Sequence, residues 1–232
     1  MKINRALDSI RNGEFVLVHD ASEREDETDL VIAAEKVRPA HVAEMRRDGG
    51  GLICVALHPK AAKNLNLPLL TDIYKAASSA HEVLDAAAAN DLPYDERSSF
   101  SISVNHRDTF TGVTDEDRAL TISELGKLAN QAFNGSAPTD FGRNFRTPGH
   151  VPLLRAAEGL TDERQGHTEL SVVLMVMAGI SPAAAICEML DDETSRALSH
   201  QSAREYAEEG GLVYLEGDEI RDAFSDWRSV RK

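Results

Sequence analysis

Short apolar runs alternate along this chain with segments whose apolar residues recur at helical spacing. Alternating or continuous apolar runs predict strands at 15–18, 30–34, 52–57, 99–104, 151–154, 184–190 and 212–215. Helical spacing or helix-forming composition predicts helices at 3–12, 39–47, 76–90, 115–129, 168–179, 196–208 and 218–228. Residues 134–147 are polar and rich in turn formers, which predicts a loop. Strands and helices interleave without a repeat or a linker, so we expect one domain over residues 1–232 with a central sheet covered by helices.

Composition narrows the classes of function. Asp and Glu number 39 against 25 Lys and Arg, giving a formal net charge of −14, and such a surface repels nucleic acid and anionic membranes. The scarcity of Lys among the basic residues suggests the hypothesis of a salt-rich cytosol, which stability rising with KCl concentration would support. No apolar run approaches the ~20 residues of a membrane span. The N-terminus has no apolar core of a signal peptide, so we expect a cytoplasmic protein.

The two cysteines, Cys54 and Cys187, lie inside apolar runs. We therefore expect buried free thiols, because two residues can form neither a disulfide framework nor a thiolate metal site.

The first candidate site is the charged segment 24–29, which stands between two apolar runs. An isolated charge run is more often a solvated face than a functional site. This run is short and adjoins a strand on each side, so its residues lie at strand ends, where open sheets commonly form sites. Alternation places Glu25, Glu27 and Asp29 on one side, and carboxylates are the oxygen ligands that Mg²⁺ or Mn²⁺ prefers.

The second candidate is the segment 164–169, directly before a strongly apolar helix. The free N–H groups of a helix start, together with Arg164, Gly166 and the Thr168 hydroxyl, would suit a phosphate group. His167 could ligate a metal through a neutral imidazole. The alternative is that Thr168 only caps the helix and that Arg164 is a surface side chain.

Three further segments are candidates, and the first of them is weak by itself. Pro148-Gly149 predicts a turn that would place His150 at the end of a strand, although a histidine in a turn is more often structural. Glu188 stands inside an apolar strand, where it would pair with a cation or have a raised pKa unless the strand is a sheet edge facing water. Residues 109–114 offer hydroxyls and a glycine before a capped helix, a second candidate anion site. Motifs for nucleotide hydrolysis, nicotinamide binding or a serine nucleophile are absent from the sequence.

Taken together and in order, these segments resemble the 3,4-dihydroxy-2-butanone-4-phosphate synthase family. The segments that carry the resemblance are Arg24-Glu25-x-Glu27-x-Asp29, Gly51–Val55, Thr111–Val113 with Asp117–Ala119, Pro148–His150, Gly166–Glu169 and Ile186–Glu188. Each motif is unspecific alone, whereas the ordered set is specific and spans nearly the whole chain. Thr147–His150 and the strand at 98–102 resemble archaeal members more than bacterial ones. Two cysteines cannot form the zinc site of the GTP cyclohydrolase domain fused to some members, so we expect a monofunctional member.

The resemblance implies an α+β fold, a three-layer α–β–α sandwich around a mixed twisted sheet. It also implies a homodimer whose active sites are built from both chains. The expected activity is that of a lyase, which converts D-ribulose 5-phosphate to L-3,4-dihydroxy-2-butanone 4-phosphate and formate in riboflavin biosynthesis. The implied cofactor is Mg²⁺ or Mn²⁺.

By motif position, the resemblance assigns roles to individual residues. Glu25 and His167 would hold the metal, and Glu27 would lie near the reacting carbons. His150 and Glu188 would be essential to proton transfer. Contacts with ribulose 5-phosphate are expected from Arg24, Glu25, Asp29, Arg164, Gln165, Gly166, His167 and Thr168, the last five at its phosphate end.

Two departures from the family pattern lie beside these positions. Ala21-Ser22 stands where bacterial members carry a denser acidic run, and Thr28 stands where glycine is common. Both concern the mobility of the 20–28 loop more than the reaction.

Two other classes of function stay open on the sequence alone. A metal-dependent aldolase or epimerase acting on pentose phosphates would use similar residues, and release of formate separates it from the lyase. The family fold is related to an RNA-binding one, but the net charge of −14 and the lack of a basic stripe argue against a nucleic-acid partner.

Overall fold

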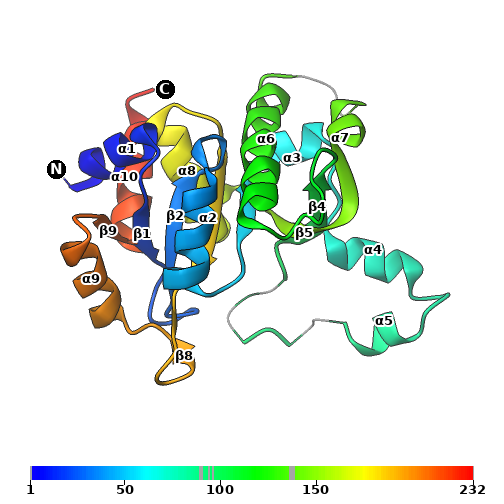
Figure 1. Ribbon diagram of the computed structural model, residues 1–232, viewed down its shortest axis with the longest axis horizontal. Helices are drawn as coiled ribbons and strands as arrows, with labels where there is room; N and C mark the ends of the chain where they lie inside the picture. Colours follow the sequence, from blue (N-terminus) through cyan, green and yellow to red (C-terminus); the bar gives the residue numbers. More distant parts are fainter. Residues whose placement is uncertain (1, 89–90, 94, 96, 136–138, 232) are drawn as a thin grey trace.

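A seven-stranded mixed sheet forms the centre of the computed structural model, which describes residues 2–88, 91–93, 95, 97–135 and 139–231 (Figure 1). The strand order is β4-β5-β3-β6-β2-β1-β9. Its strands are β1 (Val16–His19), β2 (Thr28–Ala33), β3 (Cys54–Leu57), β4 (Phe100–His106), β5 (Phe145–Arg155), β6 (Ala183–Glu188) and β9 (Val213–Glu216). The pairs β1–β9 and β3–β5 are parallel, and the other neighbours are antiparallel. Every predicted strand is present.

Side-chain alternation along the strands divides the core into two layers. On β1, Leu17 belongs to one buried cluster while Val16 and Val18 belong to the other. One face of the sheet is covered by α2 (Pro39–Glu44), α3 (Pro59–Asn64), α6 (Asp115–Phe133) and α9 (His200–Glu209). The other face is covered by α1 (Lys2–Asn12), α8 (His167–Ala178) and α10 (Gly217–Ser229). The expected three-layer arrangement around a mixed sheet is therefore confirmed.

The helix α8 is the most deeply buried helix of its layer. All of its residues except Val176 are buried, as expected for a helix that is apolar on every side. It ends at Gly179, whose φ of 71° is the left-handed conformation that glycine adopts readily. The expected start of α6 is also confirmed, because the Thr114 hydroxyl caps it by accepting from the Asp117 N–H.

Three predicted elements differ from the structure. The alanine-rich stretch 76–90 is not one helix, because α4 (Leu70–Ala77) ends within it and α5 covers only Val83–Ala86; residues 89–90 lie outside the described residues. Neither α4 nor α5 buries a residue, so no packing supports a longer helix. The expected loop 134–147 contains α7 (Thr139–Asn144) and the start of β5. The helix expected from 196 begins at His200, since β8 (Arg196–Ala197) pairs with β7 (Leu190–Asp191).

The remaining elements are short turns of helix. A 3₁₀ turn η1 (Ala34–Lys36) follows β2, a π turn η2 (Met45–Gly49) continues α2, and a 3₁₀ turn η3 (Leu160–Asp162) precedes α8. Both cysteines are buried and free, as expected.

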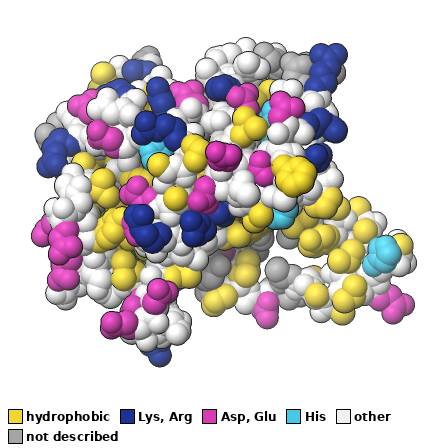
Figure 2. Space-filling model, viewed as in Figure 1, with side chains coloured by type: hydrophobic (Ala, Val, Ile, Leu, Met, Phe, Trp, Pro, Cys, Tyr) yellow, Lys and Arg dark blue, Asp and Glu magenta, His cyan; other side chains and the backbone are white. Residues whose placement is uncertain are grey.

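Two features concern the surface. Figure 2 shows apolar side chains gathered over α4 and α5, and Ile73, Tyr74 and Val83 are among the exposed ones. Within the described ranges, no helix is long and apolar enough to cross a membrane.

Candidate functional site

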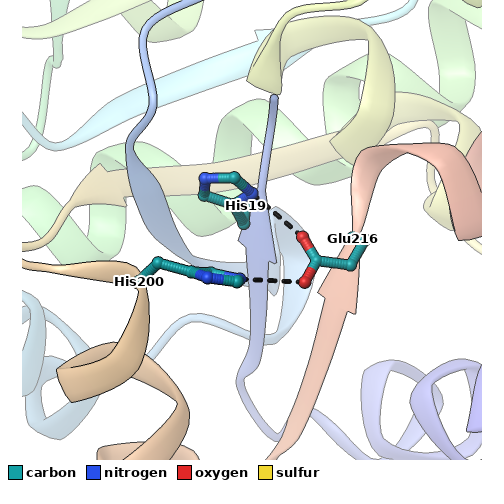
Figure 3. Close-up of side chains that lie close together, drawn as sticks. All are labelled: His19, His200 and Glu216. Carbon is teal, nitrogen blue, oxygen red and sulfur yellow. Dashed lines mark hydrogen bonds and ion pairs between the residues drawn. The ribbon is translucent and has the colours of Figure 1, made fainter. Parts of the chain in front are cut away.

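The first segment of the site begins where β1 ends, at the buried His19. The Nδ1 atom of His19 lies 2.9 Å from Glu216 Oε2 at the end of the neighbouring strand β9 (Figure 3). Its Nε2 atom lies 3.1 Å from Asp26 Oδ1. His19 thus connects the sheet to the loop 20–27, which we call the site loop.

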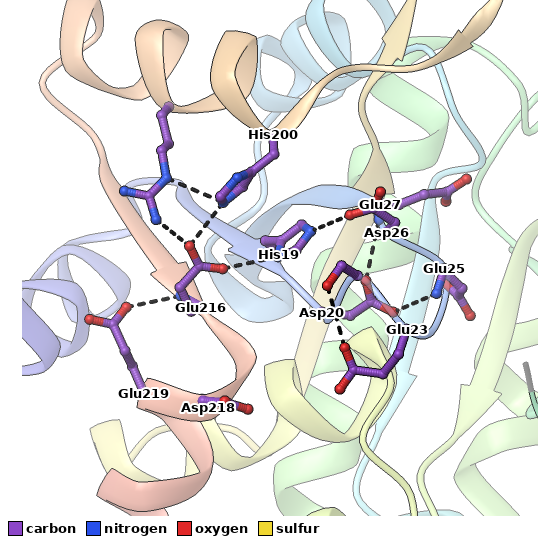
Figure 4. Close-up of polar contacts among 12 residues, drawn as sticks. His19, Asp20, Glu23, Glu25, Asp26, Glu27, His200, Glu216, Asp218 and Glu219 are labelled. Atoms are coloured by element: carbon purple, nitrogen blue, oxygen red, sulfur yellow. Dashed lines mark hydrogen bonds and ion pairs between the residues drawn. The ribbon is translucent and has the colours of Figure 1, made fainter.

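The site loop is folded around the buried carboxylate of Asp20 (Figure 4). Asp20 Oδ2 accepts from the Glu25 N–H at 3.1 Å and from Arg24 Nη1 at 3.0 Å. Asp20 Oδ1 accepts from the Glu27 N–H at 3.2 Å. Sequence reasoning gave this residue no role, although its place directly after a buried strand could have indicated one. Asp20 fixes the backbone from which Glu25 and Glu27 project.

A cavity of about 430 Å³ lies where the start of β2 meets the end of β6 and the N-terminus of α8. This volume suits a small-molecule ligand. Eight of the residues predicted for the site line it: Arg24, Glu25, Glu27, Asp29, Arg164, His167, Thr168 and Glu188. The expectation that the acidic segment and the α8 start belong to one site is consistent with this geometry.

His167, at the first position of α8, is buried among carboxylates. Its Nδ1 lies 3.3 Å from Glu25 Oε2, and its Nε2 lies 3.1 Å from the Glu27 carbonyl oxygen and 3.7 Å from Asp29 Oδ1. Burial alone would lower the pKa of His167, but the charge of Asp29 and the hydrogen bond with Glu25 outweigh it and raise the pKa to about 10. The imidazole therefore lies in a position of strong negative potential, which favours a cation.

The acidic side chains of the cavity repel one another. Burial, followed by the charge of Glu25, raises the pKa of Glu27. Burial raises the pKa of Asp29 well above its usual range, and His167 only partly opposes this. The buried Asp29 Oδ1 has no hydrogen-bond partner within the described part of the chain. An unsatisfied buried carboxylate oxygen among further carboxylates is what a divalent cation would stabilise.

Glu188 ends β6, a strand in the interior of the sheet. Its Oε2 accepts a hydrogen bond from the Leu52 N–H at 2.7 Å. The alternative of an edge strand facing water is therefore wrong, because β6 pairs with β2 on one side and β3 on the other. Gly51 makes room for this carboxylate, since a Cβ there would lie 2.4 Å from Glu188 Oε2.

The N-terminus of α8 carries the basic part of the cavity. Gly166 is the N-cap of α8, so the alternative in which Thr168 only caps the helix is wrong. Arg164 is partly buried, with Nη1 donating to Glu169 Oε2 at 2.7 Å, so it is not a surface side chain. A Cβ at Gly166 would lie 2.4 Å from Arg164 Nη1, so a larger residue would displace the guanidinium from its present position.

Asp95 is a second residue that sequence reasoning missed. Its Oδ2 accepts from Arg24 Nη2 at 3.2 Å and from Arg164 Nε at 2.5 Å, so one carboxylate joins the two predicted substrate-binding arginines. Asp95 lies in a polar segment far from both arginines in sequence, and no local pattern could have indicated this contact.

Three predicted site residues, Gly166, Gln165 and His150, do not line the cavity of this chain. Gln165 points toward α10, where its Oε1 accepts from Arg221 Nη1. His150 is exposed on β5, and its N–H donates to Asn105 Oδ1 at 2.8 Å. The expected turn before His150 is wrong, because Pro148 and Gly149 lie within β5 at an irregularity of its pairing with β4.

The second candidate anion site, residues 109–114, is filled by a carboxylate of the chain itself. Asp117 Oδ2 accepts from the N–H groups of Thr111 and Gly112, at 3.1 and 2.8 Å, and Asp117 Oδ1 accepts from the Phe110 N–H. The prediction of an anion site at 109–114 is therefore wrong, because Asp117 already accepts hydrogen bonds from these N–H groups.

Comparison with known proteins points to one family over nearly the whole chain. A family model described as 3,4-dihydroxy-2-butanone 4-phosphate synthase matches residues 4–223. The synthases of that name from Methanosarcina acetivorans and Archaeoglobus fulgidus are 53% and 52% identical, over 97% and 99% of this chain and 92% and 97% of theirs. A solved structure of such a synthase in complex with two magnesium ions is 31% identical, with a TM-score of 0.76 and 94% of each chain covered.

Proposed function

Because this chain belongs to the 3,4-dihydroxy-2-butanone 4-phosphate synthase family, we propose that the cavity between β2, β6 and α8 is its active site. The chain is a lyase that converts D-ribulose 5-phosphate to L-3,4-dihydroxy-2-butanone 4-phosphate and formate, a divalent-metal-dependent step of riboflavin biosynthesis. The resemblance to the archaeal, monofunctional members is confirmed. The observation that carries the assignment of the cavity is the buried Asp29 Oδ1, which has no hydrogen-bond partner among the described residues and lies in the same cavity as Glu25, Glu188 and His167.

Glu25 and His167 are the proposed metal ligands. One ligand atom from each, together with one from Asp20, lie within 4.8 Å of one another. Carboxylate oxygens with an imidazole suit Mg²⁺ and also Mn²⁺, which tolerates nitrogen better. When bound, the ion would supply Lewis-acid stabilisation of the negative charge that develops on adjacent substrate oxygens. Asp20, which already holds the Glu25 backbone, would keep Glu25 directed at this position.

The phosphate of the substrate is proposed to bind at the start of α8. Arg164, His167 and Thr168 line the cavity there, and the first N–H groups of α8 have no acceptor within the helix. Arg24 and Arg164 both donate to Asp95, so Arg24 lies near the same phosphate position. Gln165 and Gly166 stand between Arg164 and the helix start, and we propose that they complete the phosphate-binding segment. A phosphate would take the place of the Asp95 carboxylate between the two arginines.

Proton transfer is proposed for Glu188, Glu27 and His150. The Leu52 N–H fixes one oxygen of Glu188 and leaves the other for the substrate. The raised pKa of Glu27 suits a carboxyl group that exchanges protons nearer neutral pH, and each such group typically contributes ~10²–10⁴ in rate. Asp29, opposite Glu188, would contact the substrate or the metal.

A homodimer with shared active sites would bring the remaining residue into place. His150 is exposed outside the cavity of its own chain, and Asn105 connects it to the segment around Gly112. Phe110 and Val113 in that segment are 93% and 51% exposed, so they offer apolar area that a partner could cover. Burying this face against a second copy would let the partner's His150 enter the cavity. The cytoplasm of a salt-rich cell stays the proposed setting.

The experiment that tests the function is formate release from ribulose 5-phosphate, with Mg²⁺, with Mn²⁺ and with EDTA. We expect formate with either metal and none with EDTA. The Glu188→Gln variant should lose at least about 100-fold in turnover. The control variant Glu208→Gln, at an exposed position of α9, should keep the turnover of the wild type. Near-normal turnover of Glu188→Gln would refute its catalytic role, and absence of formate from the folded protein would refute the assignment of the reaction.

A further inference from the structure

A second group of metal-ligating side chains lies behind the site loop. His19 ends β1, Glu216 ends β9 and His200 begins α9, and the register of the parallel pair β1–β9 places His19 opposite Glu216 (Figure 3). One ligand atom from each of the three lies within 4.8 Å of the others. None of them borders the cavity of the proposed active site.

The ring of His19 contacts a carboxylate on each side. Its Nδ1 lies 2.9 Å from Glu216 Oε2, and its Nε2 lies 3.1 Å from Asp26 Oδ1 (Figure 4). A neutral imidazole has only one N–H, so one of these contacts joins two lone-pair atoms unless a further cation, proton or metal, lies at the ring. A histidine that donates one N–H to a carboxylate and presents its other nitrogen to a cation has the usual arrangement of a metal ligand.

His200 and the second carboxylate oxygen of Glu216 both contact the Arg204 guanidinium. His200 Nε2 lies 2.9 Å from Glu216 Oε1. Arg204 donates to both atoms, from its Nε to His200 Nε2 at 3.2 Å and from its Nη2 to Glu216 Oε1. The guanidinium also stacks on the Tyr214 ring at 4.9 Å, so it keeps a favourable contact if it leaves the carboxylate.

We propose that His19, His200 and Glu216 bind a divalent transition-metal ion, Zn²⁺ or a chemically related ion, at a site separate from the magnesium site. Two imidazoles with one carboxylate favour zinc, whereas the carboxylate-rich cavity suits magnesium. Bonds of ~2.0–2.1 Å place tetrahedral ligand atoms about 3.4 Å apart, which small rotations of these side chains provide. The exposure of His200 leaves the fourth position to water, and the ion would replace the Arg204 guanidinium as the local positive charge.

Co²⁺ is the probe for the test, since its visible absorption reports coordination directly. The parent protein carries Glu25→Gln and His167→Asn, which remove the proposed magnesium ligands and leave the second site intact. We expect one equivalent of Co²⁺ to bind with a visible absorption band and to be displaced by Zn²⁺. Far-UV circular dichroism and thermal melting verify that each protein is folded.

Further variants in the same parent define the ligands. His200→Ala, at an exposed helix start, should weaken Co²⁺ binding more than about 100-fold, since loss of a group that only supports a metal ligand typically costs about 10- to 100-fold. His81→Ala, at another exposed histidine, is the matched control and should bind as the parent does. Arg204→Met should tighten binding, because it removes the competing cation. Absence of a saturable absorption band in the folded parent, or equal binding by His200→Ala and His81→Ala, overturns the proposal.

Discussion

Asp29 and Glu188 are directly opposite each other in the antiparallel register of β2 and β6, and both border the same cavity. Two carboxylates so placed repel each other, and the charge of Glu188 contributes to the raised pKa of Asp29. The register of the sheet therefore places two carboxyl groups side by side, where a divalent ion would offset their repulsion.

Mixing two inactive variants tests whether the active sites are shared. His150→Asn and Glu188→Gln are each expected to be inactive. If His150 acts in the partner's cavity, random reassembly of a mixture gives half mixed dimers with one intact site each, hence about a quarter of wild-type formate release. The measurement is formate release after dissociation and reassembly. Activity no higher than that of the single variants would place both residues in one chain's site.

The Asp20 carboxylate is expected to set both metal affinity and stability. Asp20→Ala leaves the Glu25 and Glu27 N–H groups without their acceptor, so we expect a loss of about 1–3 kcal/mol in unfolding free energy. Mg²⁺ affinity should fall about 10- to 100-fold, because Glu25 is no longer held. Urea denaturation and Mg²⁺ titration measure the two effects. Asp20→Asn, which keeps one acceptor, should be intermediate, and wild-type affinity in Asp20→Ala would contradict this role.

Asp95 is expected to compete with phosphate for the two arginines. Asp95→Asn removes its negative charge from between Arg24 and Arg164, so inorganic phosphate should inhibit the variant at about 3- to 10-fold lower concentration. The inhibition constant against ribulose 5-phosphate is the measurement. Asp91→Asn changes the net charge equally in the same segment and serves as the control. Equal inhibition constants in the two variants would argue against phosphate binding at this position.

His58 predicts a pH dependence of stability. Burial, followed by the charge of Lys60, lowers the pKa of His58 to about 4, against about 6.5 in the unfolded chain. Between these values only the unfolded state takes up the proton, so the unfolding free energy falls as pH decreases from 6.5 to 4. The loss should be about 1–2 kcal/mol, since the ring is only half-buried.

The comparison variant for this effect is His58→Asn, which keeps an acceptor for the Lys60 N–H at the start of α3. Urea denaturation between pH 4 and 7.5 should show a smaller decrease for the variant than for the wild type. Parallel curves for the two proteins would exclude His58 as the source.

The sheet and most of the acidic and basic site residues could be predicted from the sequence because they depend on local patterns. Alternation along β2 and β6 sets which side chains face each helical layer, and the apolar α8 marks the helix whose start borders the cavity. The ordered motifs then gave the family.

Contacts between distant segments could not be predicted in this way. Asp95 reaches Arg164 across a large separation in sequence, and Asp117 fills a loop that by composition resembled an anion site. Helix propensity likewise failed at 76–90, where no tertiary packing supports the alanine run. The proposed role of His150 could not be predicted from local patterns either, because it depends on a second copy of the chain.

The site loop is held by contacts within the chain: the Asp20 carboxylate accepts from two backbone N–H groups and from the Arg24 guanidinium, and Asp26 contacts His19. These contacts restrict the backbone positions from which Glu25 and Glu27 project. Binding then has little conformational entropy to remove from this loop, so more of the intrinsic interaction energy is retained as affinity. A protein with this arrangement should recruit its metal quickly from dilute solution, limited by dehydration of the ion rather than by folding of the chain.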